Sequence, residues 1–219
     1  MKNPFYFLII LFSLCTVFVG CKEKRAVKKY VHIPPSMPDS VYQKLEEGDI
    51  ILRKGAGPLS FQIMNATKEE YSHCGIIVKE KETWRVIHSM GGSVSNNHDD
   101  GMQIMDLEDF VLNAADSMLF ICRATFQDSL GRRIKEGAYK FLNEDAPFDH
   151  SFSLFTRDKI YCSELLFYVL RDATGENQMK IRKQHRSYIL LFETFFDESK
   201  YKPIFHLKDL NRKVQSFSD

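Results

Sequence analysis

One cysteine stands where a polar turn gives way to an apolar run with helical spacing. Residues 158–168 read DKIYCSELLFY. Leu165, Leu166 and Val169 recur at the spacing of one helix face, which predicts a helix that begins at or beside Cys162. The first turn of a helix carries unpaired N–H groups and partial positive charge, and both lower the pKa of a thiol. We therefore interpret Cys162 as a candidate nucleophile; the alternative is a small buried core cysteine.

A predicted strand upstream offers an imidazole to this thiol. Residues 71–78 read YSHCGIIV. Because side chains alternate along a strand, His73 and Gly75 share a face, and Gly75 leaves space beside the imidazole. Cys74 points to the opposite face. We predict that His73 is the catalytic base; the alternative is a structural histidine bonded to a backbone carbonyl.

A second imidazole, His88, lies on the next predicted strand, residues 83–89. A polar turn at 79–82 joins the two strands into a hairpin. If the hairpin closes symmetrically over Glu80 and Lys81, His73 and His88 are direct cross-strand partners, with Cβ atoms about 4.5–5.5 Å apart. One imidazole then fixes the tautomer of the other, on the face that looks toward Cys162. A loop one residue longer or shorter would move His88 to the other face.

Short strands and helices alternate along the rest of the chain. Strands are expected at 50–52, 102–105, 117–125 and 203–207, and helices at 40–45, 58–66, from 106, at 129–142 and at 187–196. Polar loops separate them at 91–101 and 143–157. This order predicts an α+β domain with an antiparallel sheet core.

The N-terminus carries an apolar segment that ends in cysteine. Residues 5–19 are almost unbroken apolar sequence, and the segment closes with FVGC at Cys21. This ending resembles a bacterial lipobox, whose cysteine receives the lipid. We predict a signal peptide at 1–20, a linker at 21–39 that begins with lipidated Cys21, and a catalytic domain at 40–219. An ordinary secretory signal or an uncleaved anchor is the alternative, and each route exports the chain to the cell envelope.

Charge and cysteine content exclude two classes of protein. The formal net charge of +1 gives no electrostatic reason to expect nucleic acid as a partner. Five cysteines are present, and three remain once Cys15 leaves with the signal and Cys21 is lipidated. An odd number without framework spacing argues against a disulfide scaffold.

A metal site is the rival use of these side chains. The possible zinc ligands are His73, Cys74, His88 and Cys162. Cys74, however, alternates away from His73, and no CxxC spacing is present. We expect neither a metal nor a cofactor.

Four segments together resemble a known family. In order they are GDIIL at 48–52, YSHCGIIV at 71–78, FD at 148–149 and YCSELL at 161–166. They look like the permuted papain-like amidases of the YiiX/YebB type, which belong with the NlpC-type cell-wall peptidases. The resemblance covers residues 45–170.

The resemblance implies a circularly permuted papain-like fold, in which the histidine strand precedes the nucleophile-bearing helix. It also implies a thiolate at Cys162 and a base at His73. The family often has Glu at the third position, where this chain has His88. That departure resembles the lecithin:retinol acyltransferase-like proteins, so acyl transfer stays open beside hydrolysis.

These observations predict an exported, lipid-anchored cysteine hydrolase that cleaves an amide bond in a peptide or cell-wall-derived substrate. Tyr161, Asp149 and Ser72 are expected to contact that substrate, and the Cys162 N–H to bind the oxyanion. Glu164 is expected to stay charged near the positive end of the helix. The alternatives are an acyltransferase or lipid amidase with the same site, or a non-catalytic ligand- or metal-binding lipoprotein.

Overall fold

The computed structural model describes residues 29–30, 36–92, 100–185, 187–208 and 214–215. The chain divides into two units, and residues 32–212 form the larger one. In the smaller unit, β1 (Lys29–Tyr30) pairs antiparallel with β10 (Val214–Gln215). The predicted signal segment and Cys21 lie outside the described residues. Within the described ranges, no helix combines the length and the apolar character needed to span a bilayer.

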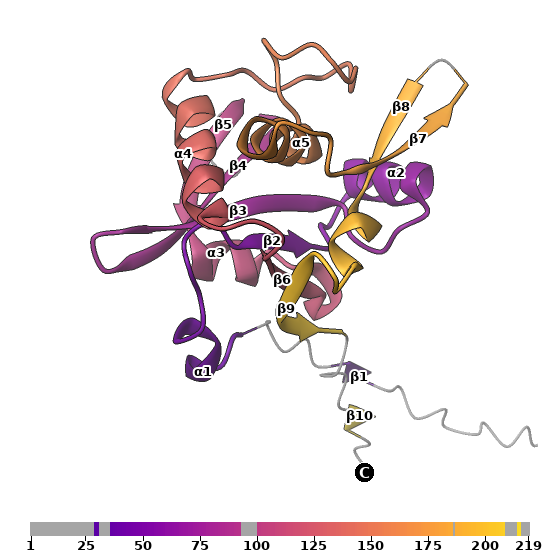
Figure 1. The fold of residues 1–219 in the computed structure, drawn as a ribbon. Helices are drawn as coiled ribbons and strands as arrows, with labels where there is room; N and C mark the ends of the chain where they lie inside the picture. The colour runs from indigo at the N-terminus through magenta and orange to yellow at the C-terminus, as the bar shows by residue number, and fades with distance from the viewer. Residues whose placement is uncertain (1–28, 31–35, 93–99, 186, 209–213, 216–219) are drawn as a thin grey trace, which may run out of the picture. The chain divides into compact units, whose positions relative to one another are not determined.

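A six-stranded antiparallel sheet forms the centre of the larger unit, in the order β5-β4-β3-β2-β6-β9 (Figure 1). Its strands are β2 (Ile50–Arg53), β3 (His73–Glu80), β4 (Thr83–Met90), β5 (Gly101–Asp106), β6 (Leu119–Ala124) and β9 (Tyr201–Leu207). The central strands β2 and β3 are buried on both faces, which is why they read as continuous apolar runs. The predicted α+β class with an antiparallel core is confirmed.

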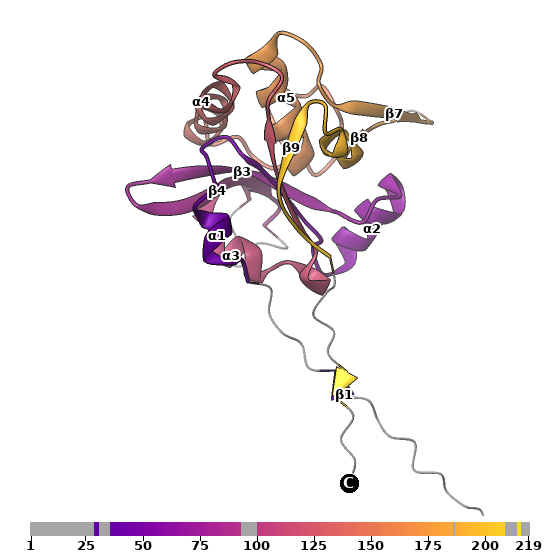
Figure 2. The ribbon, with the colours of Figure 1, turned by 60° about the horizontal axis from the view of Figure 1, so that its bottom comes forward.

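Helices cover both faces of this sheet (Figure 2). The face that carries Cys74 and Ile76 packs against α4 (Leu130–Asn143) and α5 (Cys162–Thr174). The other face, with Ile77 and Val86, packs against α1 (Asp39–Tyr42) and α3 (Leu107–Leu112). Two apolar clusters therefore hold the sheet between helical layers.

The C-terminal region departs from the prediction. Residues 187–196 form β8 (Ser187–Leu191) and the 3-10 helix η2 (Phe192–Phe196) instead of one α-helix. β8 pairs with β7 (Lys180–Gln184) as a separate hairpin. The apolar spacing of Leu191, Phe192 and Phe195 imitated a helix, although it comes from the end of a strand followed by one tight turn. Two short helices complete the unit, α2 (Pro58–Thr67) and η1 (Ala115–Ser117).

The β3–β4 hairpin closes one residue later than the symmetric turn predicted. Glu80 pairs with Thr83, and Ile76 pairs with Ile87. His88 therefore follows in register opposite Gly75, so the prediction that it directly faces His73 is wrong. Each strand moves by one residue, which preserves the side-chain parity and keeps both histidines on one face.

Candidate active site

Helix α5 begins at Cys162, as the sequence predicts. The side chain is buried, and its Sγ lies 4.0 Å from the Ser72 carbonyl oxygen. Hydrogen bonding from the Cys74 thiol lowers the pKa of Cys162 below its ordinary value, and the backbone N–H groups of Ser163, Cys74 and Cys162 add to this, against the effect of burial. The start of α5 thus supplies the environment that favours a thiolate.

The other two described thiols have the opposite tendency. Burial raises the pKa of Cys74 and of Cys122 well above the usual thiol value. All three described cysteines are free of disulfides. Among them, Cys162 alone has a lowered pKa.

His73 and His88 form a buried pair. His73 Nε2 lies 3.1 Å from His88 Nδ1, and the rings meet edge to face. A Cβ on Gly75 would lie 3.3 Å from His88 Cβ and 2.4 Å from Val86 Cγ1, so this glycine makes room for the pair. Burial, with Arg53 nearby, lowers the pKa of His73 well below its usual value and that of His88 to about 3. Both imidazoles are therefore neutral near pH 7.

The face on which this pair lies corrects the sequence interpretation. Both rings pack against Phe110 of α3, whereas α5 covers the sheet face of Cys74. The histidines thus do not share the face that carries the nucleophile helix. Cys162 and His73 come together at the end of the sheet, where β3 begins, because α5 also begins there.

A small cavity joins the two catalytic candidates. Its volume is about 150 Å³, and Cys162, His73 and Ser72 all line it. Ser72 Oγ accepts a hydrogen bond from the Gly55 N–H at 2.9 Å, which fixes the loop after β2. His88 has no place in this lining and sits behind His73. The structure therefore brings Ser72, His73 and Cys162 to one space and puts His88 in the layer behind it.

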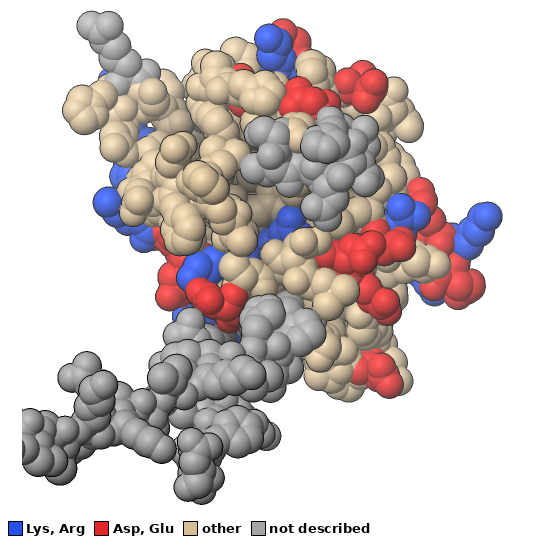
Figure 3. All heavy atoms as spheres, turned by 180° about the vertical axis from the view of Figure 1, so that it is seen from behind, with Lys and Arg blue, Asp and Glu red and all other residues tan. Residues whose placement is uncertain are grey.

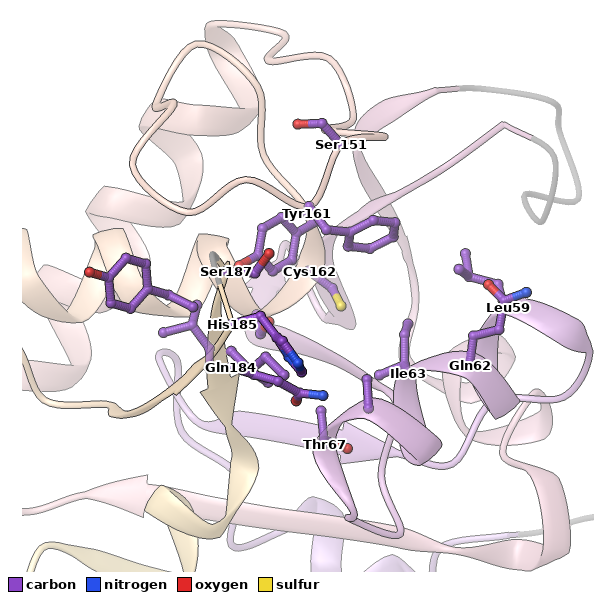
Figure 4. Close-up of a pocket in the computed structure, with 16 residues that line it drawn as sticks. Leu59, Gln62, Ile63, Thr67, Ser151, Tyr161, Cys162, Gln184, His185 and Ser187 are labelled. Carbon is purple, nitrogen blue, oxygen red and sulfur yellow. The ribbon is translucent and has the colours of Figure 1, made fainter.

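A larger cleft opens on the other side of Cys162 (Figure 4). It has a volume of about 470 Å³ and lies between α2 and the β7–β8 hairpin. Tyr161 and Cys162 line it, and the sulfur of Cys162 points into the space that faces α2. The sequence contained no motif for this hairpin, so its wall of the cleft was not predicted.

Asp149, expected to contact substrate, is used inside its own loop. Its Oδ1 accepts hydrogen bonds from the Ser151 N–H and Oγ, and Oδ2 accepts one from the Ser153 N–H. Burial alone would raise the pKa of Asp149, but these bonds outweigh it and lower the pKa. The residue lines neither of the two cavities that Cys162 lines. Its role in the structure is to shape the loop before α5.

Arg53 is a site residue that the sequence analysis missed. It ends β2, pairs in register with His73, and lines the small cavity with Cys162. The residue is 5% exposed; its guanidinium carbon lies 4.1 Å from the Phe110 ring centroid, and Nη1 donates to the Phe110 carbonyl at 2.8 Å. Burial lowers the pKa of Arg53 to about 10, which leaves it charged at neutral pH. The sequence did contain a signal for this residue, because a charged arginine that ends an apolar strand must find a partner in the interior.

We expect Arg53→Gln to raise the pKa of the Cys162 thiol by about one unit, because a buried cation favours the thiolate. The measurement is the rate of iodoacetamide reaction with Cys162 as a function of pH. Arg85→Gln is the control, since Arg85 pairs with Asp106 on the far side of β4. An unchanged midpoint in Arg53→Gln would show that this cation does not act on the thiol.

Glu164 also differs from expectation, because it is fully buried. Its Oε1 accepts a hydrogen bond from the Phe155 N–H at 3.2 Å and so anchors the loop before α5. Burial raises the pKa of Glu164 to about 7. The carboxyl group is therefore partly protonated at neutral pH, whereas the sequence analysis expected it to stay charged.

The raised pKa of Glu164 predicts that the free energy of unfolding depends on pH. A carboxyl whose folded pKa exceeds its unfolded pKa contributes full stability below about pH 4.5, and the contribution falls as the pH rises toward 7. Glu164→Gln removes the titration and keeps the acceptor oxygen. We expect the variant to match the wild type near pH 4.5 and to be more stable by up to about 3 kcal/mol at pH 8. Urea unfolding of both proteins at the two pH values measures this; equal differences at both would contradict it.

The possible metal ligands form two pairs on opposite faces of the sheet. Cys74 and Cys162 lie in the cluster beneath α5, whereas His73 and His88 pack against α3. Within the part of the chain that the structure describes, no group of three or more His, Cys, Asp and Glu side chains is placed to hold a metal ion.

Comparisons with known proteins identify a structural neighbour and a family. The chain is similar to the crystal structure of the metalloprotein yiiX from Escherichia coli O157:H7, with a TM-score of 0.62 and 19% identity over 74% of this chain and 98% of that one. This likeness concerns the fold. A search of curated proteins found no match. The sequence model described as "Permuted papain-like amidase enzyme, YaeF/YiiX, C92 family" matches residues 44–190. The chain therefore belongs to the permuted papain-like amidases of the YaeF/YiiX, C92 family.

Proposed function

We propose that this protein is a cysteine hydrolase that cleaves amide bonds through Cys162, with His73 as the base and His88 as its orienting partner. The observation that carries the proposal is a buried thiol of lowered pKa in one cavity with a histidine whose other ring nitrogen is already engaged. Membership in an amidase family supports it. A nucleophile, a base and a group that orients the base are the three parts such catalysis needs.

We assign one pair of tautomers to the two bonded imidazoles. If His73 Nε2–H donates to His88 Nδ1, then Nδ1 of His73 keeps its lone pair and can accept the proton of Cys162. His88 must then carry its own proton on Nε2, an atom without a hydrogen-bond partner among the described residues. In this arrangement, neutral His88 accepts the hydrogen bond from the His73 N–H. A Glu at this position, which is frequent in the family, would accept the same bond.

The first half of the reaction forms a thioester. Cys162 Sγ attacks the amide carbonyl, and His73 Nδ1 takes the thiol proton. The backbone N–H groups at the start of α5 stabilise the oxyanion, and Arg53 supplies the only permanent charge in the described lining of the small cavity. The C–N bond then breaks, and His73 gives its proton to the leaving amine. A neutral resting imidazole suits this sequence, because it must accept a proton before it donates one.

The second half returns the enzyme to its starting state. Water attacks the thioester carbonyl, and His73 Nδ1 takes a proton from that water. The C–S bond breaks, the carboxylic acid is released, and the proton returns to Cys162 or to solvent. Atoms balance as one water consumed for each amide cleaved.

Trapping of the acyl intermediate tests the proposal. Wild-type protein mixed with an amide substrate and quenched in acid should carry the acyl mass on the peptide that contains Cys162. His73→Ala should show no such adduct on the same timescale. Hydrolysis without any adduct on this peptide, or hydrolysis that persists in Cys162→Ala, would overturn the mechanism.

We also propose that a lipid on Cys21 tethers the protein to a cell-envelope membrane, because an apolar segment stops at Gly20-Cys21. Mass spectrometry of the mature N-terminal peptide should find a diacylglyceryl-modified Cys21. Cys21→Ser should release the protein into the soluble fraction. An unmodified peptide that begins at another residue would disprove the tether.

A further inference from the structure

Two cavities of different character meet at Cys162. The small cavity holds Arg53, His73 and Asn113, and the larger cleft lies between α2 and the β7–β8 hairpin. Both are lined by Cys162, and three apolar side chains separate them: Leu59, Ile63 and Phe152. An amide held over the sulfur would therefore extend in both directions.

The proton donor decides which side takes the leaving amine. His73 must reach the amide nitrogen to protonate it, and His73 lines only the small cavity of the two. The amine therefore departs on that side. The acyl group, which stays bound to Cys162 as the thioester, must then lie in the larger cleft.

The surface of the larger cleft is mostly apolar and carries no permanent charge. Its described lining contains no Asp, Glu, Lys or Arg side chain, and its polar members include Gln62, Gln184, His185 and three serines. Helix α2, which forms one wall, reads PLSFQIMNAT without a charged residue, and Figure 3 shows an uncharged area on the side of the molecule that carries this helix. A cell-wall peptide would bring carboxylates and amines, and this described lining offers them no permanently charged partner. The volume of about 470 Å³ is in the range of sites that enclose a small organic ligand.

The two walls of the cleft are fixed to each other. Arg182 of β7 donates to the carbonyl oxygens of Ala66 and Thr67, at the end of α2, at 2.6 and 3.0 Å. Glu69, just beyond α2, accepts hydrogen bonds from the backbone N–H groups of Phe192 and Glu193. These hydrogen bonds tie the two walls of the cleft together.

Apolar side chains are also exposed beside it. Tyr188 of β8 is 40% exposed and lines the cleft, and its ring lies 5.7 Å from that of Phe155, which is 55% exposed. Exposed aromatic pairs of this kind are typical of surfaces that receive apolar ligands.

We infer that the cleft between α2 and the β7–β8 hairpin binds the apolar acyl chain of an N-acyl amide. This inference rests on the proposed function, and it names the substrate class: a lipid-like amide with a medium-length chain, cleaved to a fatty acid and an amine. Ile63 and Ile189 line opposite walls and set the contact with the chain.

Binding to the full chain with Cys162→Ala tests the inference without turnover. Acetyl-, hexanoyl- and decanoyl-glycinamide are the probes, measured by calorimetry. Each added methylene should tighten binding about two- to fourfold until the cleft is full, so the decanoyl amide should bind at least about 100-fold more tightly than the acetyl amide. Added to this variant, Ile189→Gln should reduce that ratio to about tenfold or less.

Ile204→Gln in the same background is the matched control. Ile204 is also a half-buried isoleucine in a strand, but it packs against the cluster on the other sheet face. The Ile204→Gln variant should keep the full ratio of decanoyl-amide to acetyl-amide affinity. Equal affinity at all chain lengths, or tighter binding of the charged peptide alanyl-γ-glutamyl-diaminopimelate, would overturn the inference. Chain-length-dependent binding without hydrolysis by the wild type would support the acyl site and overturn the proposed function instead.

Discussion

Replacing Cys162 by alanine is expected to reduce amide hydrolysis by at least about 10⁴-fold, since no other described thiol can take over as nucleophile. Cys74 and Cys122 are buried and have raised pKa values. The substitution removes one sulfur from the start of α5 and leaves the helix sequence otherwise unchanged. Initial rates with an N-acyl amide, together with a circular dichroism melt, measure activity and folding separately.

Thiol labelling provides the matching control for that variant. Near pH 6, iodoacetamide should modify Cys162 ahead of Cys74 and Cys122, because only the Cys162 pKa is lowered. Cys122→Ala, which removes a core thiol far from the cavities, should retain turnover. Equal labelling of the three cysteines, or full activity in Cys162→Ala, would remove Cys162 from the mechanism.

The second large effect concerns the histidine pair. His73→Ala is expected to lower kcat by about 10³-fold, because it removes the group that moves the proton. His88→Ala should cost less, about ten- to a hundredfold, since His88 acts only by holding His73 through the 3.1 Å bond. Steady-state kinetics of both variants, with the alkylation profile of Cys162, separate loss of the base from loss of its orientation.

Rescue distinguishes orientation from packing. His88→Gln keeps an acceptor for the His73 N–H, so it should recover part of the rate, whereas His88→Leu fills the same space and should not. A circular dichroism melt of both variants checks that they fold, since each replaces the His88 ring that packs on Phe110. If Leu and Gln gave the same rate, His88 would be a packing residue.

Local patterns were enough to predict most of the fold. The buried strands β2 and β3 and the start of α5 each carry their signal in adjacent residues, so the sheet and the nucleophile helix were predictable. The register of β3 against β4 was not predictable, because the polar segment between the strands can form its turn at either of two positions. The structure forms it one residue later than predicted and places Lys81 at a φ of +54°. The β7–β8 hairpin was missed because the apolar spacing around Leu191 and Phe195 fits a helix equally well.

Long-range packing limited the prediction of the site. Strand parity placed His73 and His88 on one face, which the 3.1 Å contact confirms. Parity does not say which helix covers that face, and Phe110 of α3 covers it. Arg53 and buried Glu164 depend on contacts with residues far away in the chain, so a neighbour-based pattern assigns them to the surface.

If the cleft binds the acyl chain as we infer, the β7–β8 hairpin is the part of the chain whose exchange would change the range of substrates. It forms its own two-stranded sheet and lies in the chain between α5 and the edge strand β9. The exposed part of this ribbon can therefore be exchanged while the ladder hydrogen bonds of the six-stranded sheet stay intact, provided that Leu190, which belongs to the core beneath α5, is kept. We expect a longer or shorter ribbon to shift the preferred chain length of the amide.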